Sequence, residues 1–148
     1  MFPLPPIQHK QYDAFVSGAT AAREDLLRMR KNTVRPTDIK LHQKSRILEV
    51  TFGEGSRFEF PAEYLRVYSP SAEVRGHGPG QEVLQVNKES VNIVGIEPVG
   101  SYAVLLRFDD GHDTGIYSWD LLYNLGVNQD RLWKEYISRL EQAGYKRN

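Results

Sequence analysis

Two similar stretches decide the fold of this chain: residues 48–65, LEVTFGEGSRFEFPAEYL, and residues 104–121, VLLRFDDGHDTGIYSWDL. Each contains an apolar strand, an acidic-glycine turn, a second short strand and an aromatic-leucine helical turn. The repetition predicts two copies of one structural unit. Aligned directly, the matched pairs are Phe52 and Phe108, Gly55 and Gly111, Ser56 and His112, and Leu65 and Leu121.

Each copy is expected to begin as a β-hairpin followed by a helical turn. Glycine after acidic residues suits a tight turn, because glycine adopts positive φ without a Cβ clash. Pro61 suits the first position of the first helical turn, where a missing N–H costs little. Ser118 can cap the second by accepting a bond from an orphan N–H. Trp119 and Trp133 occupy apolar periodic positions, which favours core packing over a ligand platform for both.

The rest of the chain supplies further strands and one clear helix. Period-two apolar residues predict strands around residues 39–41, 83–86 and 92–97. Asn128 is a plausible cap for a helix with one apolar stripe, and Gly144 offers it a left-handed end. The predicted fold is α+β: a small antiparallel sheet domain built from two hairpin-plus-helical-turn repeats, with a C-terminal amphipathic helix packed on it.

Three parts are expected along the chain. Residues 1–35 form an N-terminal extension, flexible or partly helical over 14–30, because three early prolines prevent regular structure at the start. Residues 36–126 form the domain, and residues 127–148 form the helix packed on it.

Composition excludes several classes of function. The chain has 148 residues, with 19 basic and 19 acidic side chains. This balance does not favour binding to nucleic acid or to an anionic membrane surface. Cysteine is absent, which excludes disulfides, thiolate metal ligands and thiol nucleophiles. With no secretory signal and no apolar stretch of about 20 residues, we expect a cytoplasmic protein.

His112, with Asp109, Asp110 and Asp113 around it, is the first candidate for chemistry. A neutral imidazole beside carboxylates could bind a metal or act as an acid or base. Equally, the acidic-glycine run is a turn and His112 a polar residue that follows it. No nucleophile or phosphate-loop motif is present, so we do not expect an enzyme.

Residues 75–81, RGHGPGQ, form a second candidate, a glycine-rich loop. Its backbone N–H groups could bind an anion, with Arg75 supplying charge and His77 a switchable donor. The other interpretation is a flexible surface loop. The stretch 64–74 just before it is rich in tyrosine and arginine, which are enriched at binding hot spots, although the tyrosines could also complete the core.

Three motifs give the chain a family resemblance: FPAEYLRVYSPSAEV at 60–74, RGHGPG at 75–80 and DGHDTGIYSW at 110–119. They resemble the bacterial DUF971 family, also called gamma-butyrobetaine hydroxylase-like N-terminal domains, over about residues 35–126. The resemblance implies a small non-catalytic module. Similar domains precede iron- and 2-oxoglutarate-dependent oxygenase domains in hydroxylases, and others are fused to ATPases of iron–sulfur cluster assembly.

The resemblance also implies a structural zinc ion, held in the hydroxylases by three cysteines and a histidine. Carried over by position, the cysteines fall on Ser69, Ser71 and Val74, and the histidine falls on His112. Serine and valine are not zinc donors, so we expect the family's zinc to be lost and no cofactor to be bound. His112 and His77 remain as metal candidates only if they meet in space with an acid.

The resulting hypothesis is an interaction module that binds a protein partner, either a metalloenzyme or an iron–sulfur assembly factor. The alternatives are a small metal or ligand binder that uses His112 and His77, and a homodimer formed through an exposed sheet edge. The predicted binding surface consists of Arg66, Tyr68, Ser69, Ser71, Arg75, His77, Gln81, His112 and Asp113.

Overall fold

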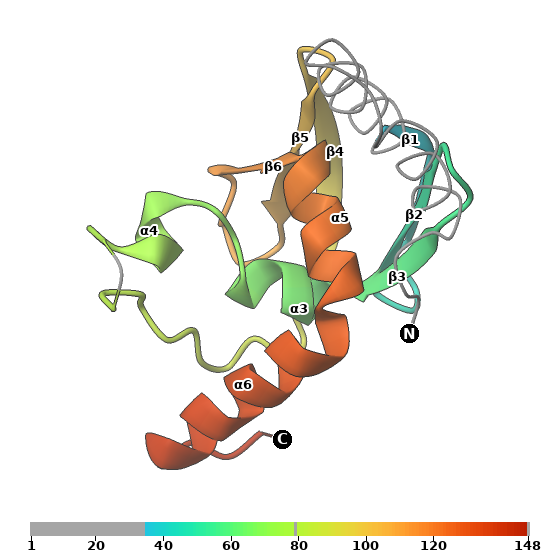
Figure 1. The fold of residues 1–148 in the computed structure, drawn as a ribbon. Helices are drawn as coiled ribbons and strands as arrows, with labels where there is room; N and C mark the ends of the chain where they lie inside the picture. Colours follow the sequence, from blue (N-terminus) through green and yellow to red (C-terminus); the bar gives the residue numbers. More distant parts are fainter. Residues whose placement is uncertain (1–34, 79, 148) are drawn as a thin grey trace, which may run out of the picture.

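The computed structural model describes residues 35–78 and 80–147 (Figure 1). The expected N-terminal extension, with its helix over 14–30, lies outside the described residues. The described chain is α+β, as predicted, but its strands divide into two three-stranded antiparallel sheets, ordered β1-β2-β3 and β4-β5-β6. Each sheet pairs strands that are consecutive in the chain, and the sequence pattern did not show that the two units keep separate sheets.

The first sheet consists of β1 (Pro36–His42), β2 (Ile47–Phe52) and β3 (Arg57–Pro61). Every second residue of β2 is buried, which places Leu48, Val50 and Phe52 on the core face. Across the hairpin Val50 lies opposite Phe58. The turn is closed by the Phe52 N–H bonded to the Ser56 carbonyl at 2.8 Å. The predicted hairpin is therefore confirmed.

The second sheet repeats this pattern with β4 (Ile93–Val99), β5 (Ala103–Phe108) and β6 (Gly115–Ser118). The Phe108 N–H bonds to the His112 carbonyl at 2.9 Å, as Phe52 bonds to Ser56. The φ angles of Gly55 and Gly111 are 108° and 90°, in the left-handed region that favours glycine. Each unit also gains a third strand, β1 or β4, before its hairpin.

One residue is inserted in the second unit between its turn and its last strand. Val50 pairs with Phe58, whereas Leu106, the counterpart of Val50, pairs with Gly115. Counting from the turns, Phe58 is two residues after Ser56 and Gly115 is three after His112. The counterpart of Leu65 is thus Leu122, not Leu121, and both Leu65 and Leu122 are fully buried.

Helices α3 (Ala62–Val67) and α5 (Trp119–Val127) follow the hairpins. Pro61 ends β3 and immediately precedes α3, one residue before the predicted place. The hydroxyl of Ser118 accepts a hydrogen bond from the Leu121 N–H at 3.1 Å, which confirms the predicted cap of α5. Helix α5 lies across the middle of the molecule (Figure 1) and contacts β3, β6 and α6. It closes a core that both sheets share.

Helix α6 (Gln129–Gln142) is the predicted C-terminal helix, and Gly144 after it has the expected left-handed φ of 82°. The Asn128 side chain does not cap it, because its amide donates instead to the Asn124 carbonyl. Trp133 is partly buried, and it packs against both the core shared by the sheets and a smaller cluster of Val67, Tyr136 and Leu140. Tyr136 is buried on α6, and its hydroxyl donates to the Gln85 carbonyl at 2.7 Å.

The strand expected over residues 83–86 is absent from the described structure. This segment belongs to no helix or strand. Leu84 and Val86 pack on the smaller cluster that α6 forms with Val67, so burial against a helix produced the apolar pattern read as a strand. In the described ranges, no helix is long and apolar enough to span a membrane.

Candidate functional site

The structure brings the turn of the second unit against the segment that follows the first. Helix α3 leads into Ser69, and a short helix, α4 (Ala72–Arg75), follows. The Tyr117 hydroxyl of β6 donates to the Leu65 carbonyl at 2.6 Å, which holds the end of α3 against the second sheet. Gly115 allows this approach, because a Cβ there would lie 2.5 Å from the Ser69 hydroxyl oxygen.

His112 is buried, and both of its ring nitrogens have partners. Nε2 lies 2.8 Å from the Ser69 hydroxyl oxygen, and Nδ1 lies 3.2 Å from a carboxylate oxygen of Glu73. The exposed fractions of Ser69 and His112 are 1% and 5%. The imidazole therefore connects the second turn to α4 and to the end of α3.

Ser71 and Thr114 extend this network. The Ser71 hydroxyl lies 2.7 Å from that of Thr114 and also caps α4 by accepting from the Glu73 N–H. The Thr114 hydroxyl is 3.2 Å from the Glu73 carboxylate that faces His112. We call Ser69, Ser71, Glu73, His112 and Thr114 the polar cluster. It fixes the position of α4 relative to the second sheet.

Beside the polar cluster, Asp110 forms ion pairs with Arg66 and Lys88. Its carboxylate lies 2.8 Å from Nε of Arg66 and 2.6 Å from Nζ of Lys88, and it accepts from the His112 N–H at 3.1 Å. Burial raises the pKa of Asp110, but the bonds from Lys88, from the His112 N–H and from Arg66 outweigh burial and lower it to about 2. Arg66 is itself buried, and its Nη1 has no hydrogen-bond partner. Asp110 is therefore the main compensation for a buried positive charge.

The environment of His112 favours its neutral form. Burial lowers the pKa of the imidazole, and the positive charge of Arg66 lowers it further, against the opposing effects of Glu73 and Asp110. A neutral imidazole has one donor and one acceptor nitrogen, which is what a hydroxyl on one side and a carboxylate on the other require.

The polar cluster does not fit the family's structural zinc. Of the four carried-over positions only His112 is a zinc donor, and its two nitrogens are engaged by Ser69 and Glu73. In residues 35–78 and 80–147, no group of three or more His, Asp or Glu side chains is arranged to hold a metal ion. The alternative that joins His77, His112 and an acid gains no support.

The serine, imidazole and carboxylate also stand in the order of a hydrolase triad, Ser69–His112–Glu73. A nucleophile must reach its substrate, yet Ser69 is only 1% exposed. Its oxygen already accepts from the Ser71 N–H at 3.2 Å. The arrangement is therefore suited to holding segments together, and we assign it no catalytic step.

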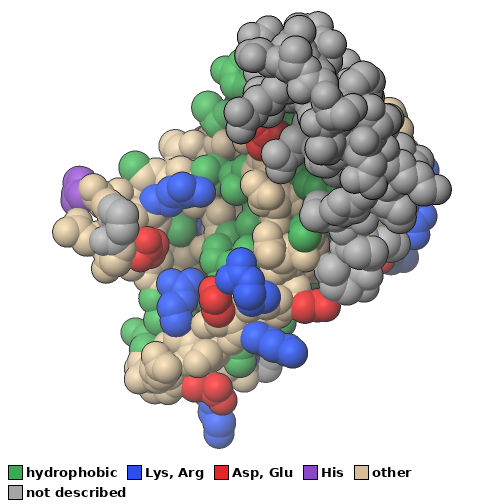
Figure 2. Space-filling model, viewed as in Figure 1, with side chains coloured by type: hydrophobic (Ala, Val, Ile, Leu, Met, Phe, Trp, Pro, Cys, Tyr) green, Lys and Arg blue, Asp and Glu red, His purple; other side chains and the backbone are tan. Residues whose placement is uncertain are grey.

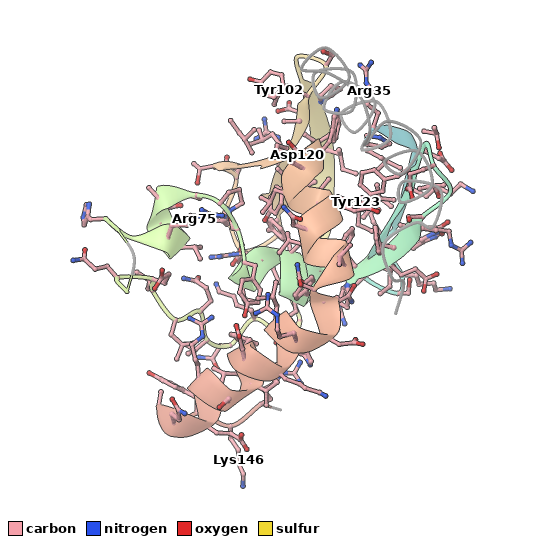
Figure 3. The ribbon with its side chains drawn as sticks, viewed as in Figure 1. Arg35, Arg75, Tyr102, Asp120, Tyr123 and Lys146 are labelled. Carbon is pink, nitrogen blue, oxygen red and sulfur yellow. The ribbon has the colours of Figure 1, made fainter. Side chains whose placement is uncertain are left out.

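A groove of about 380 Å³ opens next to the polar cluster, between the α4 segment and α6. Val67, Val74 and Val83 give it an apolar lining, and Arg75 and Arg139 line it with charge. Figure 2 shows the molecule hollowed between the part that carries α4 and the part that carries α6, and Figure 3 shows Arg75 on α4. Tyr68 and Ser69 also line the groove, so three residues of the predicted surface meet there.

The predicted surface residues fall into two groups and an outer set. Arg66, Ser69, Ser71 and His112 meet at the polar cluster or at the neighbouring ion pair of Asp110, while Tyr68, Ser69 and Arg75 line the groove. His77, Gln81 and Asp113 are exposed, and Asp113 only approaches Arg107, at 3.5 Å.

The prediction missed Thr114, Lys88 and Arg139. Each is an ordinary polar residue whose role comes from a partner distant in the chain. Only Thr114, inside the motif at 110–119, carried any signal in the sequence.

Comparison with known proteins identifies the family. The model for "Gamma-butyrobetaine hydroxylase-like, N-terminal" matches residues 39–123, more than half of the chain. The chain belongs to this family. The match covers both hairpin units and ends within α5, so α6 lies outside it.

Solved structures agree with the assignment. Two proteins with NMR solution structures are 49% and 55% identical to the chain, each with a TM-score of 0.67. The alignments cover 77% and 76% of this chain and 90% and 84% of theirs.

A third relative is a DUF971 protein of unknown function from Acidithiobacillus ferrooxidans, solved as a crystal structure. It is 36% identical with a TM-score of 0.54, over 64% of this chain and 96% of that one. A search of curated proteins found no match to this chain.

Proposed function

We propose that this domain is a non-catalytic module that binds a protein partner through the groove between α4 and α6. The observation that carries this proposal is the groove itself, which gathers Tyr68, Ser69 and Arg75 around an apolar lining. Binding hot spots are enriched in arginine and tyrosine around apolar pockets. The hydrogen bonds of the polar cluster beneath one wall favour a preformed shape, which lowers the ordering cost of binding.

The proposed partner is a metalloenzyme or an iron–sulfur cluster assembly factor. This part of the proposal is supported by the family, whose description refers to the N-terminal part of a hydroxylase. A separate domain of this kind would act on its enzyme in trans. This choice of partner is inferred from the enzymes to which related domains are joined. Substitution of residues in the groove tests it.

The test is a quantitative pull-down from lysate with the full-length chain immobilised, comparing wild type with Arg75→Ala. Lys44→Ala is the matched control, because Lys44 is an exposed cation in the turn between β1 and β2, outside the groove. We expect Arg75→Ala to lose recovery of a specific metalloprotein while Lys44→Ala retains it. Equal recovery of the partner by both variants would exclude the groove as the binding site. Sedimentation of the free chain separately measures whether it forms the sheet-edge homodimer.

A further inference from the structure

The charges of the groove do not cancel locally, although two acidic and two basic residues line it. Glu135 is already paired with Arg131 at 3.1 Å, and the carboxylate of Glu82 accepts the Gly80 N–H at 3.3 Å. Among residues 35–78 and 80–147, neither Glu82 nor Arg75 has an ion pair. With Glu135 paired outside the groove, Arg75 and Arg139 face the single carboxylate of Glu82, which leaves one positive charge in excess.

Arg139 lies on the other side of the groove, on α6. Its guanidinium lies 5.9 Å from the centre of the Tyr68 ring, a cation–π contact that places it without neutralising it. The Tyr68 hydroxyl in turn donates to the Leu132 carbonyl at 2.7 Å, which fixes the ring against α6. Two guanidinium groups from separate elements, α4 and α6, thus line one apolar hollow.

The apolar lining between them is suited to a side chain from a partner. Val67 and Val74 are buried, at 3% and 6% exposed, whereas Val83 is 52% exposed. Covering Val83 would remove apolar surface from water, which favours binding of an apolar side chain.

The main chain of this wall is already occupied. The Val83 N–H donates to the Val74 carbonyl at 2.8 Å, and the Val83 carbonyl accepts from the Gln85 side chain at 2.9 Å. A partner strand could not pair with Val83 as it would with an open sheet edge. Recognition must therefore come from side chains, which makes the charge of the partner decisive.

We propose that the groove binds an acidic protein segment, one that inserts an apolar side chain against Val83 and places carboxylates on Arg75 and Arg139. This inference rests on the proposed function and specifies the chemistry of its partner. Carboxylates are the protein side-chain groups whose geometry matches guanidinium donors in bidentate pairs.

The experiment is a selection of random heptapeptides displayed on phage, with the full-length protein as the target. Parallel selections use Arg75→Glu and the control Lys44→Glu, which makes the same charge change outside the groove. Wild type and Lys44→Glu should enrich peptides rich in Asp and Glu around an apolar residue. Arg75→Glu should lose that enrichment, and a synthetic peptide from the wild-type selection should bind it at least fivefold more weakly, the scale of one exposed ion pair.

Amide chemical shifts then locate the peptide on the wild-type protein. Shifts concentrated at Val67, Val74 and Val83 with an acidic peptide support the inference. Peptides that produce those shifts but are neutral or basic overturn the acidic partner and leave the binding groove in place. If no enriched peptide shifts those amides, both the inference and the proposed function fail.

Discussion

The turns of the two units share a backbone and differ in what their side chains reach. In the first, the Glu54 carboxylate accepts the Ser56 N–H at 3.1 Å and the Ser56 hydroxyl at 2.8 Å. In the second, Asp110 accepts the equivalent N–H of His112 at 3.1 Å, but also pairs with Arg66 and Lys88. The Glu54 bonds of the first turn stay within the turn, whereas the side chains of the second turn connect it to three other segments.

This difference shows that the same turn backbone can either bond within itself or hold distant segments together. The turn backbone needs only an acidic residue and a glycine, and both copies provide them. In the first unit the Glu54 carboxylate bonds to Ser56 of the same turn, whereas in the second Asp110 compensates the charge of buried Arg66. The inserted residue and Gly115 then let Ser69 approach the second sheet.

The largest expected loss of stability follows from the alignment that pairs Leu65 with Leu122. Leu65→Ala and Leu122→Ala should each lower the free energy of unfolding by about 2–5 kcal/mol, because both side chains are fully buried. Leu121→Ala should cost less than half as much, since Leu121 is only partly buried. Urea denaturation measures all three. Equal losses for Leu121 and Leu122 would contradict the inserted residue.

The two turn acids should differ in the same assay. Asp110→Asn should cost about 1.5–3 kcal/mol, because charged hydrogen bonds are lost and Arg66 stays buried. Glu54→Gln, the matched change in the first turn, should cost about 0.5–1 kcal/mol.

The Asp110 contribution should also depend on pH. Since the folded pKa of Asp110 is lowered to about 2, its contribution is complete above the unfolded value of about 4 and is lost as the pH falls toward 2. Asp110→Asn should remove that acid-dependent loss, and an unchanged acid profile would argue against the ion pairs.

Gly115→Ala tests the close approach at the polar cluster. An added Cβ would lie 2.5 Å from the Ser69 hydroxyl oxygen, so we expect a cost of about 1–3 kcal/mol from overpacking. Gly78→Ala is a suitable control, because nothing lies within 4 Å of the Cβ it would add. The double variant Gly115→Ala with Ser69→Gly should recover part of the loss if Ser69 causes it.

The smallest effect concerns His112. Its folded pKa is lowered, so protonation favours the unfolded chain: the contribution to stability is complete above the unfolded pKa of about 6.5 and falls as the pH drops through the folded pKa. His112→Gln should cost about 1 kcal/mol at pH 7.5 and flatten the slope below pH 6.5. A stability that rises on mild acidification of the wild type would contradict the neutral imidazole.

Local features of the fold followed from the sequence. The hairpin turns, the Ser118 cap and the left-handed Gly144 each depend on a few neighbouring residues, and all three are confirmed. The inserted residue was not visible, because the alternation on both sides of it remains regular. The segment 83–86 was misread because Leu84 and Val86 pack against the cluster that α6 forms with Val67, which no local pattern reveals.

The site was predictable only in part, because local motifs contain some of its residues and the tertiary fold brings in the others. Ser69, Ser71 and His112 were placed together through the family motif, and they do meet. Arg139 and Lys88 come from segments with no motif, and only the tertiary fold brings them to the groove and to Asp110.

Four tyrosine hydroxyls, those of Tyr64, Tyr68, Tyr117 and Tyr136, donate to carbonyls between 51 and 64 positions away in the chain. Hairpins can form in about 1–10 μs, but these bonds must wait until distant segments meet. We therefore expect α6 to dock late in folding. Tyr68→Phe, which removes the bond to Leu132 on α6, should then accelerate unfolding in stopped-flow measurements and leave the folding rate nearly unchanged. The Tyr68 hydroxyl on the groove wall would then contribute to the lifetime of the folded protein, beside its role in placing α6.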